Sequence, residues 1–265
     1  TVRILKNPEG KKTVLAYFDR VEDASFTVSD IIAAGIVPAA LEMMDKTAIE
    51  GVEAGNYPVG HPKGLEALLL VEVDGISVGI DDQIEEILKV CQKRNVRDVK
   101  VAESEQERAR WWANRKTAFP AMGAISPDYL VQDGVIPRSR LPEVLDKVYQ
   151  ISRESGLRIA NVFHAGDGNL HPLILFDARK PGETELAIRV GSQVLQACAE
   201  AGGSITGEHG VGIEKREEMK FIFSEEELQA QTQIRDVFNP NNLLNPGKLF
   251  PQPGRCAEVR KTPLR

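Results

Sequence analysis

Two histidines flank a tight turn in the segment HAGDGNLH, residues 164–171. The chain has only four histidines, so half of them lie within these eight positions. An Asp-Gly pair between two apolar strands favours a two-residue hairpin loop, because both central residues of that turn need a positive φ. With Asp167 and Gly168 at its centre, His164 pairs with His171, and opposed β-carbons lie about 4.5–5.5 Å apart on one face of the sheet. Two imidazoles placed in this way could bind one metal ion.

The same segment has a purely structural explanation. In that alternative one histidine is packed, the other is exposed, and the glycines serve only the geometry of the turn. On the octapeptide alone both explanations stay open. A third ligand would favour the metal site, and the candidate is Glu208 in the segment GGSITGEHGVG, residues 202–212.

A short strand predicted over residues 204–206 leads into this second motif, where Glu208 and His209 stand between glycines. Because adjacent side chains in an extended segment point apart, we expect one of them to bind a metal and the other to face a substrate. Two histidines and one carboxylate leave coordination positions open, as in sites where a metal does chemistry or orients a substrate. The alternative is a glycine-rich helix entry, with Glu208 as an acid in the first helical turn.

Composition narrows the class of protein. The net charge of −6, with acidic and basic residues interspersed, argues against binding to nucleic acid or a lipid surface and favours small molecules or proteins as partners. Three scattered cysteines, Cys91, Cys198 and Cys256, do not make a disulfide framework, so we expect a reducing, cytoplasmic location. The longest apolar run, residues 68–71, is far shorter than the roughly 20 residues of a membrane helix. The chain opens on Thr1, which suggests a part of a longer protein.

The elements that must position these motifs alternate irregularly, unlike those of a doubly wound fold. We expect strands at residues 14–18, 37–44, 66–73, 96–102, 128–136, 158–164, 170–176 and 204–206. We expect helices at residues 21–34, 76–94, 103–117, 141–155, 183–201, around 214–223 and at 225–238, with a short helix within 45–64 and a loop at 118–127. No internal repeat stands out. The pattern predicts an α+β fold, mainly antiparallel sheet with flanking helices, ferredoxin-like in its first part and ending in a C-terminal helical segment.

Four segments together resemble the C-terminal half of the FAD-linked oxidases. They are HAGDGNLHP (164–172), GGSITGEHGVG (202–212), FNPNNLLNPGKLFP (238–251) and RKTAFPAMGAISPDYLVQDGVIPRSRLPEVL (115–145). The family includes the FAD-binding subunit of glycolate oxidase, to which residues 115–145 are most similar, D-lactate dehydrogenases and D-2-hydroxyglutarate dehydrogenase. No segment resembles the N-terminal flavin-binding domain of that family, and we expect it to be absent from this chain.

The resemblance implies roles for the residues of both motifs. It implies that His164, His171 and Glu208 bind a divalent metal such as zinc, iron or manganese. It also implies that His209 is the catalytic base. Such a cation would lower the pKa of a substrate hydroxyl, and a histidine could then take the proton while hydride leaves to the flavin.

Three further residues are assigned by the same resemblance. It implies that Arg115 binds the substrate carboxylate through a bidentate contact. On residue type alone, the favoured interpretation of Arg115 is a solvent-exposed charge on a helix that carries many charges. It implies that Asn245 and Lys248 approach the flavin. Relatives acting on a dicarboxylate carry Asn two positions after the second histidine, where this chain has Leu173, and this favours a small monocarboxylate such as glycolate or D-lactate.

The resulting prediction is the substrate- and metal-binding part of a flavin-dependent 2-hydroxy acid dehydrogenase. Residues 1–200 form the ferredoxin-like substrate and metal domain, and residues 201–265 complete the site and pack on the flavin domain. The resemblance implies partner subunits of an electron-transferring oxidase, through which the protein associates with a membrane. Two alternatives stay open, a flavin-independent hydrolase or oxygenase that uses the same triad, and a metal-binding module that is inactive when isolated.

Overall fold

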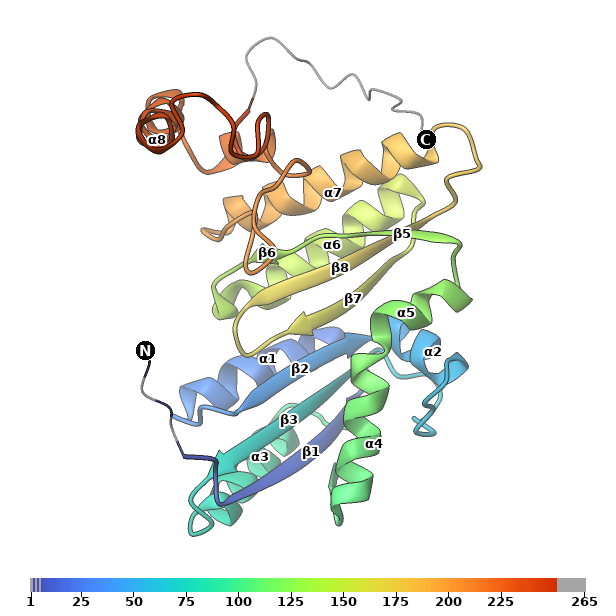
Figure 1. Ribbon diagram of the computed structural model, residues 1–265. Helices are drawn as coiled ribbons and strands as arrows, with labels where there is room; N and C mark the ends of the chain where they lie inside the picture. Colours follow the sequence, from blue (N-terminus) through green and yellow to red (C-terminus); the bar gives the residue numbers. More distant parts are fainter. Residues whose placement is uncertain (1, 3, 5, 252–265) are drawn as a thin grey trace.

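The computed structural model describes residues 2, 4 and 6–251, so Cys256 and the end of the predicted C-terminal segment lie outside the described residues. One sheet runs through the molecule in the strand order β4-β1-β3-β2-β7-β8-β5, with the short strand β6 also paired to β8 (Figure 1). All of its strand pairs are antiparallel. The prediction of a mainly antiparallel α+β fold is confirmed.

The first half of the sheet has the ferredoxin-like order β4-β1-β3-β2. Its strands are β1 (Gly10–Phe18), β2 (Ala40–Asp45), β3 (Ala67–Gly75) and β4 (Asp98–Val101). Its crossover helices are α1 (Val21–Ala33) and α3 (Ile80–Lys93), and α2 (Lys46–Ala54) lies in the connection between β2 and β3. The first part is therefore ferredoxin-like, as its sequence pattern predicts.

The second half repeats this order. Its elements are β5 (Asp128–Val131), β6 (Gly134–Val135), α6 (Leu141–Ser155), β7 (Ile159–His164), β8 (Asn169–Phe176) and α7 (Glu183–Glu200). The predicted strand at 204–206 is reduced to one bridge between Val135 and Ser204. Two edge strands join the halves, with Met43 of β2 opposite Phe163 of β7. The topology thus repeats although no sequence repeat stands out.

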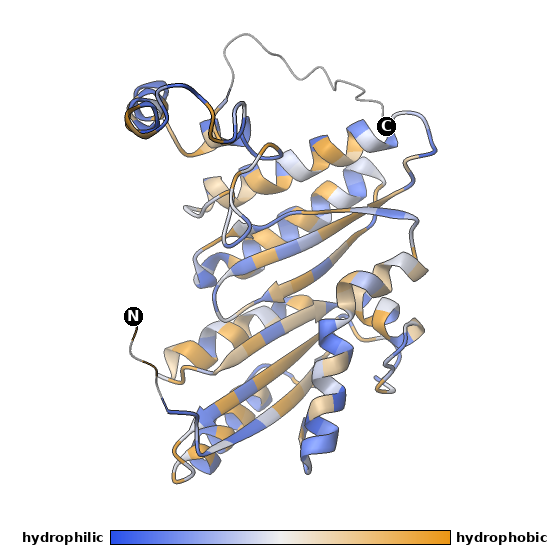
Figure 2. Cartoon of the chain, viewed as in Figure 1, coloured by the Kyte–Doolittle hydropathy of each residue, from blue (hydrophilic) through white to orange (hydrophobic). Residues whose placement is uncertain are grey.

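The two faces of the sheet are covered differently. Helices α1, α3, α6 and α7 pack on one face over a core that runs through both halves. The opposite face is covered by α2, α4 (Glu105–Lys116) and α5 (Ala118–Ala121), over a second core that runs from the first half into β7 and β8 (Figure 1). Hydrophobic residues concentrate in the strands and the packed helix faces, whereas α4 is largely hydrophilic (Figure 2). The ends of β7 and β8 near their turn carry both histidines of the first motif on this second face.

Several predicted boundaries differ from the structure. The expected loop at 118–127 contains α5 and the 3-10 turn η1 (Met122–Ala124), and the expected strand at 128–136 is broken between β5 and β6. A second 3-10 turn, η2 (Arg138–Arg140), precedes α6. The expected helix at 214–223 is reduced to η3 (Glu218–Phe221).

The last helix, α8 (Glu225–Phe238), lies apart from the sheet (Figure 1). Ser224 and Glu227 form a capping box at its start, which explains where the helix begins. None of its residues is buried. Among the described residues, no helix combines the length and the apolar character needed to cross a membrane.

Candidate functional site

The hairpin between β7 and β8 differs in register from the predicted one. His164 is opposite Asn169, and His171 is opposite Val162. The loop therefore holds four residues instead of two, and the prediction that the histidines are directly opposed is wrong. The shift is two residues, an even number, so both histidines still point to the same face of the sheet. Their ring centroids lie 5.2 Å apart in an edge-on arrangement.

Contacts from outside the hairpin explain the longer loop. The backbone N–H of Gly166 donates to the carbonyl of Leu41 on β2, over 2.9 Å. Gly168 adopts a φ of +74°, and a β-carbon there would lie 2.2 Å from the carbonyl oxygen of Ile136. Asp167 and Gly168 together do not form the turn with two positive φ angles, because only Gly168 has one. The neighbouring strand selects this turn, and the local Asp-Gly signal does not.

The second motif is held beside the hairpin by Asp133, which lies in the break between β5 and β6. Its fully buried carboxylate accepts hydrogen bonds from the backbone N–H groups of Gly207, Glu208 and His209, and from the hydroxyl of Thr206. The same carboxylate pairs with the buried ammonium of Lys215 over 3.1 Å. Burial alone would raise the pKa of Asp133, but these hydrogen bonds and Lys215 outweigh it and hold the pKa well below its usual range.

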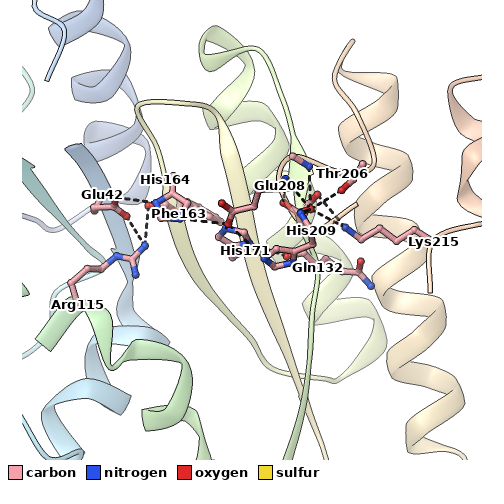
Figure 3. Close-up of polar contacts among 12 residues, drawn as sticks. Glu42, Arg115, Gln132, Phe163, His164, His171, Thr206, Glu208, His209 and Lys215 are labelled. Carbon is pink, nitrogen blue, oxygen red and sulfur yellow. Dashed lines mark hydrogen bonds and ion pairs between the residues drawn. The ribbon is translucent and has the colours of Figure 1, made fainter. Parts of the chain in front are cut away.

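Four ionisable side chains converge between the two motifs (Figure 3). Oε1 of Glu208 lies 3.0 Å from Nε2 of His171, 3.9 Å from Nε2 of His164 and 3.5 Å from Nε2 of His209. The His209 ring stacks on the His171 ring, with centroids 5.1 Å apart. The predicted divergence of Glu208 and His209 is therefore wrong, because Asp133 bends the loop so that both side chains face His171.

These separations fit a divalent metal ion. Ligand atoms about 2.0–2.2 Å from a common ion lie roughly 3–4 Å from one another. The three distances from Glu208 fall in that range. Ligand-type atoms of Asp133, His171, Glu208 and His209 lie within 4.8 Å of one another, a group that does not include the predicted ligand His164. Asp133 is the least suitable of these four, because its carboxylate is already occupied by backbone N–H groups and Lys215.

Both histidines of the first motif turn Nε2 toward Glu208, and Nδ1 of each ring has a different partner. Nδ1 of His171 lies 3.3 Å from the carbonyl oxygen of Gln132, which can only accept a hydrogen bond. Nδ1 of His164 lies 2.9 Å from a carboxylate oxygen of Glu42. In a neutral His164 ring the proton is then on Nδ1 and the lone pair on Nε2, whereas both nitrogens of His171 face acceptors, because its Nε2 also lies 3.0 Å from the Glu208 carboxylate. His164 thus has the tautomer that a metal ion at Nε2 would need.

The two rings differ in their electrostatic surroundings. The hydrogen bond to Glu42 raises the pKa of His164, against the opposing effect of burial. Burial lowers the pKa of His171, and the neighbouring His164 adds to that decrease. The His171 side chain is only 2% exposed, whereas those of Glu208 and His209 are 54% and 46% exposed. The site is therefore closed on the sheet side and open on the side of the second motif.

Arg115, on α4, is buried and does not carry a solvated charge. Its Nη2 donates to Glu42 over 2.6 Å, and both side chains are about nine-tenths buried, 10% and 9% exposed. Burial lowers the pKa of Arg115, and the charge of Glu42 opposes this change. Because Nη2 is already engaged, the predicted bidentate contact with a substrate carboxylate is not available without breaking the pair.

Asn245 and Lys248 lie on the segment that follows α8. The ammonium of Lys248 donates to the side chain of Asn245 over 3.2 Å, in an exposed position. This segment is tied to the loop after His209, since the Leu249 N–H donates to the Gly212 carbonyl over 2.7 Å. The segment that carries the two predicted flavin contacts is therefore joined by its end to the loop after the second motif.

Sequence reasoning missed two residues of the site, Asp133 and Glu42. A signal for Asp133 was present, because an acid that interrupts an apolar strand segment beside a glycine often marks a break in pairing. Glu42 alternates with the apolar Leu41 and Met43 on a buried strand, and a charge there is expected only with a partner. Its partners come from residues more than 70 positions away.

A family model described as FAD linked oxidases, C-terminal domain, matches residues 7–249. The chain is 48% identical over 258 residues to glycolate oxidase subunit GlcD of Escherichia coli strain K12, covering 97% of this chain and 52% of that protein. It is 34% identical over 255 residues to glycolate oxidase subunit GlcD of Bacillus subtilis, covering 96% of this chain and 54% of that protein. It is 28% identical over 253 residues to the mitochondrial D-lactate dehydrogenase (cytochrome) of Arabidopsis thaliana, covering 95% and 44%. The chain thus spans about half the length of the curated relatives it matches.

Solved structures share the fold at low sequence identity. A 4-ethylphenol oxidase from Gulosibacter chungangensis, in complex with isoeugenol, superposes with a TM-score of 0.68 at 16% identity, covering 93% of this chain and 55% of that chain. A p-cresol methylhydroxylase with substrate bound gives a TM-score of 0.68 at 13% identity, covering 91% and 53%. At such identities the likeness describes the fold alone.

Proposed function

The chain belongs to the FAD linked oxidases, as their C-terminal domain, and we propose that it is the substrate- and metal-binding half of a flavin-dependent 2-hydroxy acid dehydrogenase. The observation that carries the proposal is the position of Glu208 between the two motifs, with Oε1 3.0 Å from Nε2 of His171 and 3.9 Å from Nε2 of His164. The sequence identity of 48% to a glycolate oxidase subunit supports glycolate as substrate, with D-lactate as the next candidate. The products would be the corresponding 2-oxo acids.

The proposed ligands of a divalent metal are His164, His171 and Glu208. When bound, the metal would supply a Lewis acid that lowers the pKa of the substrate hydroxyl, and FAD would supply the hydride acceptor. The residues fit such an open site, because the Glu208 carboxylate is half exposed while the imidazole of His171 is almost completely buried. Zinc, iron and manganese all accept this set of two imidazoles and one carboxylate.

His209 is the proposed base that takes the hydroxyl proton at Nε2. Its ring is stacked on His171 and half exposed, so Nε2 reaches both the ligand cluster and a substrate. Arg115 is proposed to bind the substrate carboxylate through Nη1, since Nη2 donates to Glu42. Leu173 lies fully buried on β8, two residues after His171 and on the same face. It offers no polar group to a second carboxylate, which supports a small monocarboxylate.

The segment after α7 is proposed to pack on the flavin-binding part, as the division into residues 1–200 and 201–265 predicts. Large apolar side chains lie exposed along α8 and beyond it, namely Ile234, Val237, Phe238, Leu243 and Leu244, at 62–79% exposure. Contact with another domain would remove this apolar surface from water. Asn245 and Lys248, which lie in the same segment, stay the predicted flavin contacts.

The names of the relatives support further subunits as partners, because two of them are oxidase subunits. An electron-transferring complex of this kind would pass electrons onward from the flavin. A cytoplasmic location, with membrane association through those subunits, stays a prediction.

The test is oxidation of a panel of 2-hydroxy acids by the full-length, metal-loaded enzyme with a dye as electron acceptor. We expect turnover of glycolate or D-lactate only when the flavin-binding part is present, and none from this chain alone. Hydrolysis or oxygenation by this chain without flavin would instead support the alternative that uses the same triad. Binding of metal without any turnover in either form would leave only the non-catalytic module.

A further inference from the structure

We propose that Glu42 is a positioning residue that fixes the tautomer of His164 and holds Arg115 beside it. Glu42 lies on β2, in the first half of the sheet, whereas His164 ends β7 in the second half. The inference rests on the proposed function, because it treats His164 as a metal ligand. The proposal adds strand β2, from the first half of the sheet, to a site that both sequence motifs place in the second half of the sheet.

The contacts of Glu42 divide between its two carboxylate oxygens. Oε1 lies 2.9 Å from Nδ1 of His164, and Oε2 accepts from Nη2 of Arg115 over 2.6 Å (Figure 3). Glu42 and His164 point to the same face of the sheet, since Glu42 alternates with Leu41 and Met43 of the opposite core, and α4, which carries Arg115, packs on that face. Each oxygen thus has its own donor, His164 for Oε1 and Arg115 for Oε2.

The chemistry of the pair determines which nitrogen of His164 carries the proton. A carboxylate only accepts hydrogen bonds, so Nδ1 must donate to it. The lone pair of the neutral ring is then on Nε2, which lies 3.9 Å from Oε1 of Glu208. Metal-binding histidines usually have such a partner on their other nitrogen, and the partner orients the ring and increases its basicity. The backbone carbonyl of Gln132 has the same relation to His171.

Arg115 explains how a carboxylate can be buried at this place. An unpaired ionised carboxylate in the interior is strongly unfavourable, and the guanidinium beside it removes most of that penalty. Nη2 of Arg115 also lies 3.4 Å from the carbonyl oxygen of Phe163, the residue before His164. Glu42 therefore couples the proposed metal ligand to the proposed carboxylate-binding residue through one side chain.

A purely structural ion pair is the competing explanation, and the chain contains a matched example of one. Glu72, on β3, points to the same face as Glu42 and is 14% exposed. It accepts from Arg108 over 2.8 Å, from the Trp112 indole over 2.7 Å and from the Thr13 hydroxyl over 2.7 Å. These donors include no histidine. A change at Glu72 disturbs a buried arginine pair on the same sheet face without acting on the metal ligands.

The experiment measures binding of Co²⁺ and Zn²⁺ to the 265-residue chain by titration calorimetry and by the visible spectrum of bound Co²⁺, for wild type, Glu42→Gln and Glu72→Gln. Glutamine replaces one of the two carboxylate oxygens by an NH2 donor, so at one of the two positions the side chain faces His164 or Arg115 with a donor where Glu42 has an acceptor. We expect Glu42→Gln to weaken metal binding by about 10–100-fold, the usual effect of removing such a partner. We expect Glu72→Gln to bind metal as the wild type does.

A second readout follows the tautomer directly. Nitrogen-15 spectra of the metal-free chain should show the His164 proton on Nδ1 in the wild type and in Glu42→Asp, which keeps an acceptor-only carboxylate. In Glu42→Gln the spectra should show a mixture or the other tautomer. Glu42→Asp also serves if the glutamine variant fails to fold, which circular dichroism would show.

Three results would overturn the proposal. Equal metal affinity in Glu42→Gln and wild type would remove the positioning role and leave the proposed function intact. Equal losses in Glu42→Gln and Glu72→Gln would show that both pairs are only structural. Absence of metal binding by the wild type would overturn this proposal and the metal part of the proposed function together.

Discussion

The backbone N–H of His209 donates to Oδ2 of Asp133 over 3.0 Å, across 76 positions of sequence. This bond is one of several from residues 206–209 to the same carboxylate, and together they define where Glu208 and His209 lie. The loop has no regular secondary structure of its own. Its conformation is therefore determined by a single buried acid on the neighbouring strand segment and by the lysine that neutralises it.

Replacing that acid should destabilise the fold. Asp133→Asn keeps one acceptor oxygen but leaves the ammonium of Lys215, 4% exposed as a residue, without its countercharge. Breaking a buried pair by removing one partner costs about 3–5 kcal/mol. We expect a decrease of that size in the free energy of unfolding in urea, together with weaker Co²⁺ binding. Asp177→Asn is the control, because the partner of Asp177, Arg179, is 80% exposed, and it should change neither quantity. Similar losses in both variants would contradict the role given to Asp133.

The sequence predicts the elements well and the site partly. Amphipathic periods and glycines place nearly every strand and helix, because these signals are local. The register of the β7–β8 hairpin depends on Leu41 and Ile136, which contact the turn from elsewhere, so the Asp-Gly signal alone gave a loop that is two residues too short. An even shift in register leaves both histidines on the predicted face of the sheet, and Glu208 lies beside both of them. Glu42 and Asp133 act through partners that only the folded chain brings together.

Two glycines with the same φ test whether the Ile136 contact determines the turn between β7 and β8. Gly168 and Gly156 share a φ of +74°, but a β-carbon at Gly156 meets no atom within 4 Å, whereas one at Gly168 would lie 2.2 Å from the Ile136 carbonyl oxygen. Gly156→Ala should cost about 1–2 kcal/mol from backbone strain alone. Gly168→Ala should cost about 1–3 kcal/mol more, from the added steric overlap. Urea unfolding of both variants measures the difference, and equal costs would show that the Ile136 contact does not constrain the turn.

Asp45 gives the stability of the fold a defined pH dependence. Burial raises its pKa to about 6, although hydrogen bonds from the Ala48 backbone, Asn161 and Tyr149 act in the opposite direction. The folded state therefore binds the proton more tightly than the unfolded state, whose pKa is near 3.8. This contribution is fully present below about pH 4 and is lost as the pH rises through about 6, a change of about 3 kcal/mol from a shift of roughly two units.

Asp45→Asn isolates this effect, because asparagine resembles the protonated acid and does not titrate. The free energy of unfolding of wild type, minus that of the variant, should fall by about 3 kcal/mol between pH 4 and pH 7. The asparagine oxygen can still cap α2 by accepting from the Ala48 N–H, as Asp45 does over 3.0 Å. A difference that is constant across this range would show that Asp45 titrates with an ordinary pKa in the folded state.

His209 separates the proposed base from the proposed metal ligands. Its Nε2 is 3.5 Å from Oε1 of Glu208, so geometry alone would also allow it to be a fourth ligand. If it is the base, His209→Gln in the full-length enzyme should lower kcat by about 10²–10⁴-fold and leave Co²⁺ affinity unchanged. His171→Ala should abolish tight metal binding. His61→Gln is the control, since the ring nitrogens of His61 contact Tyr17 and Asn114 and no residue of the cluster, and this variant should preserve both quantities. Loss of metal binding in His209→Gln would show that His209 is a metal ligand. Full turnover in that variant would show that His209 does not take the substrate proton.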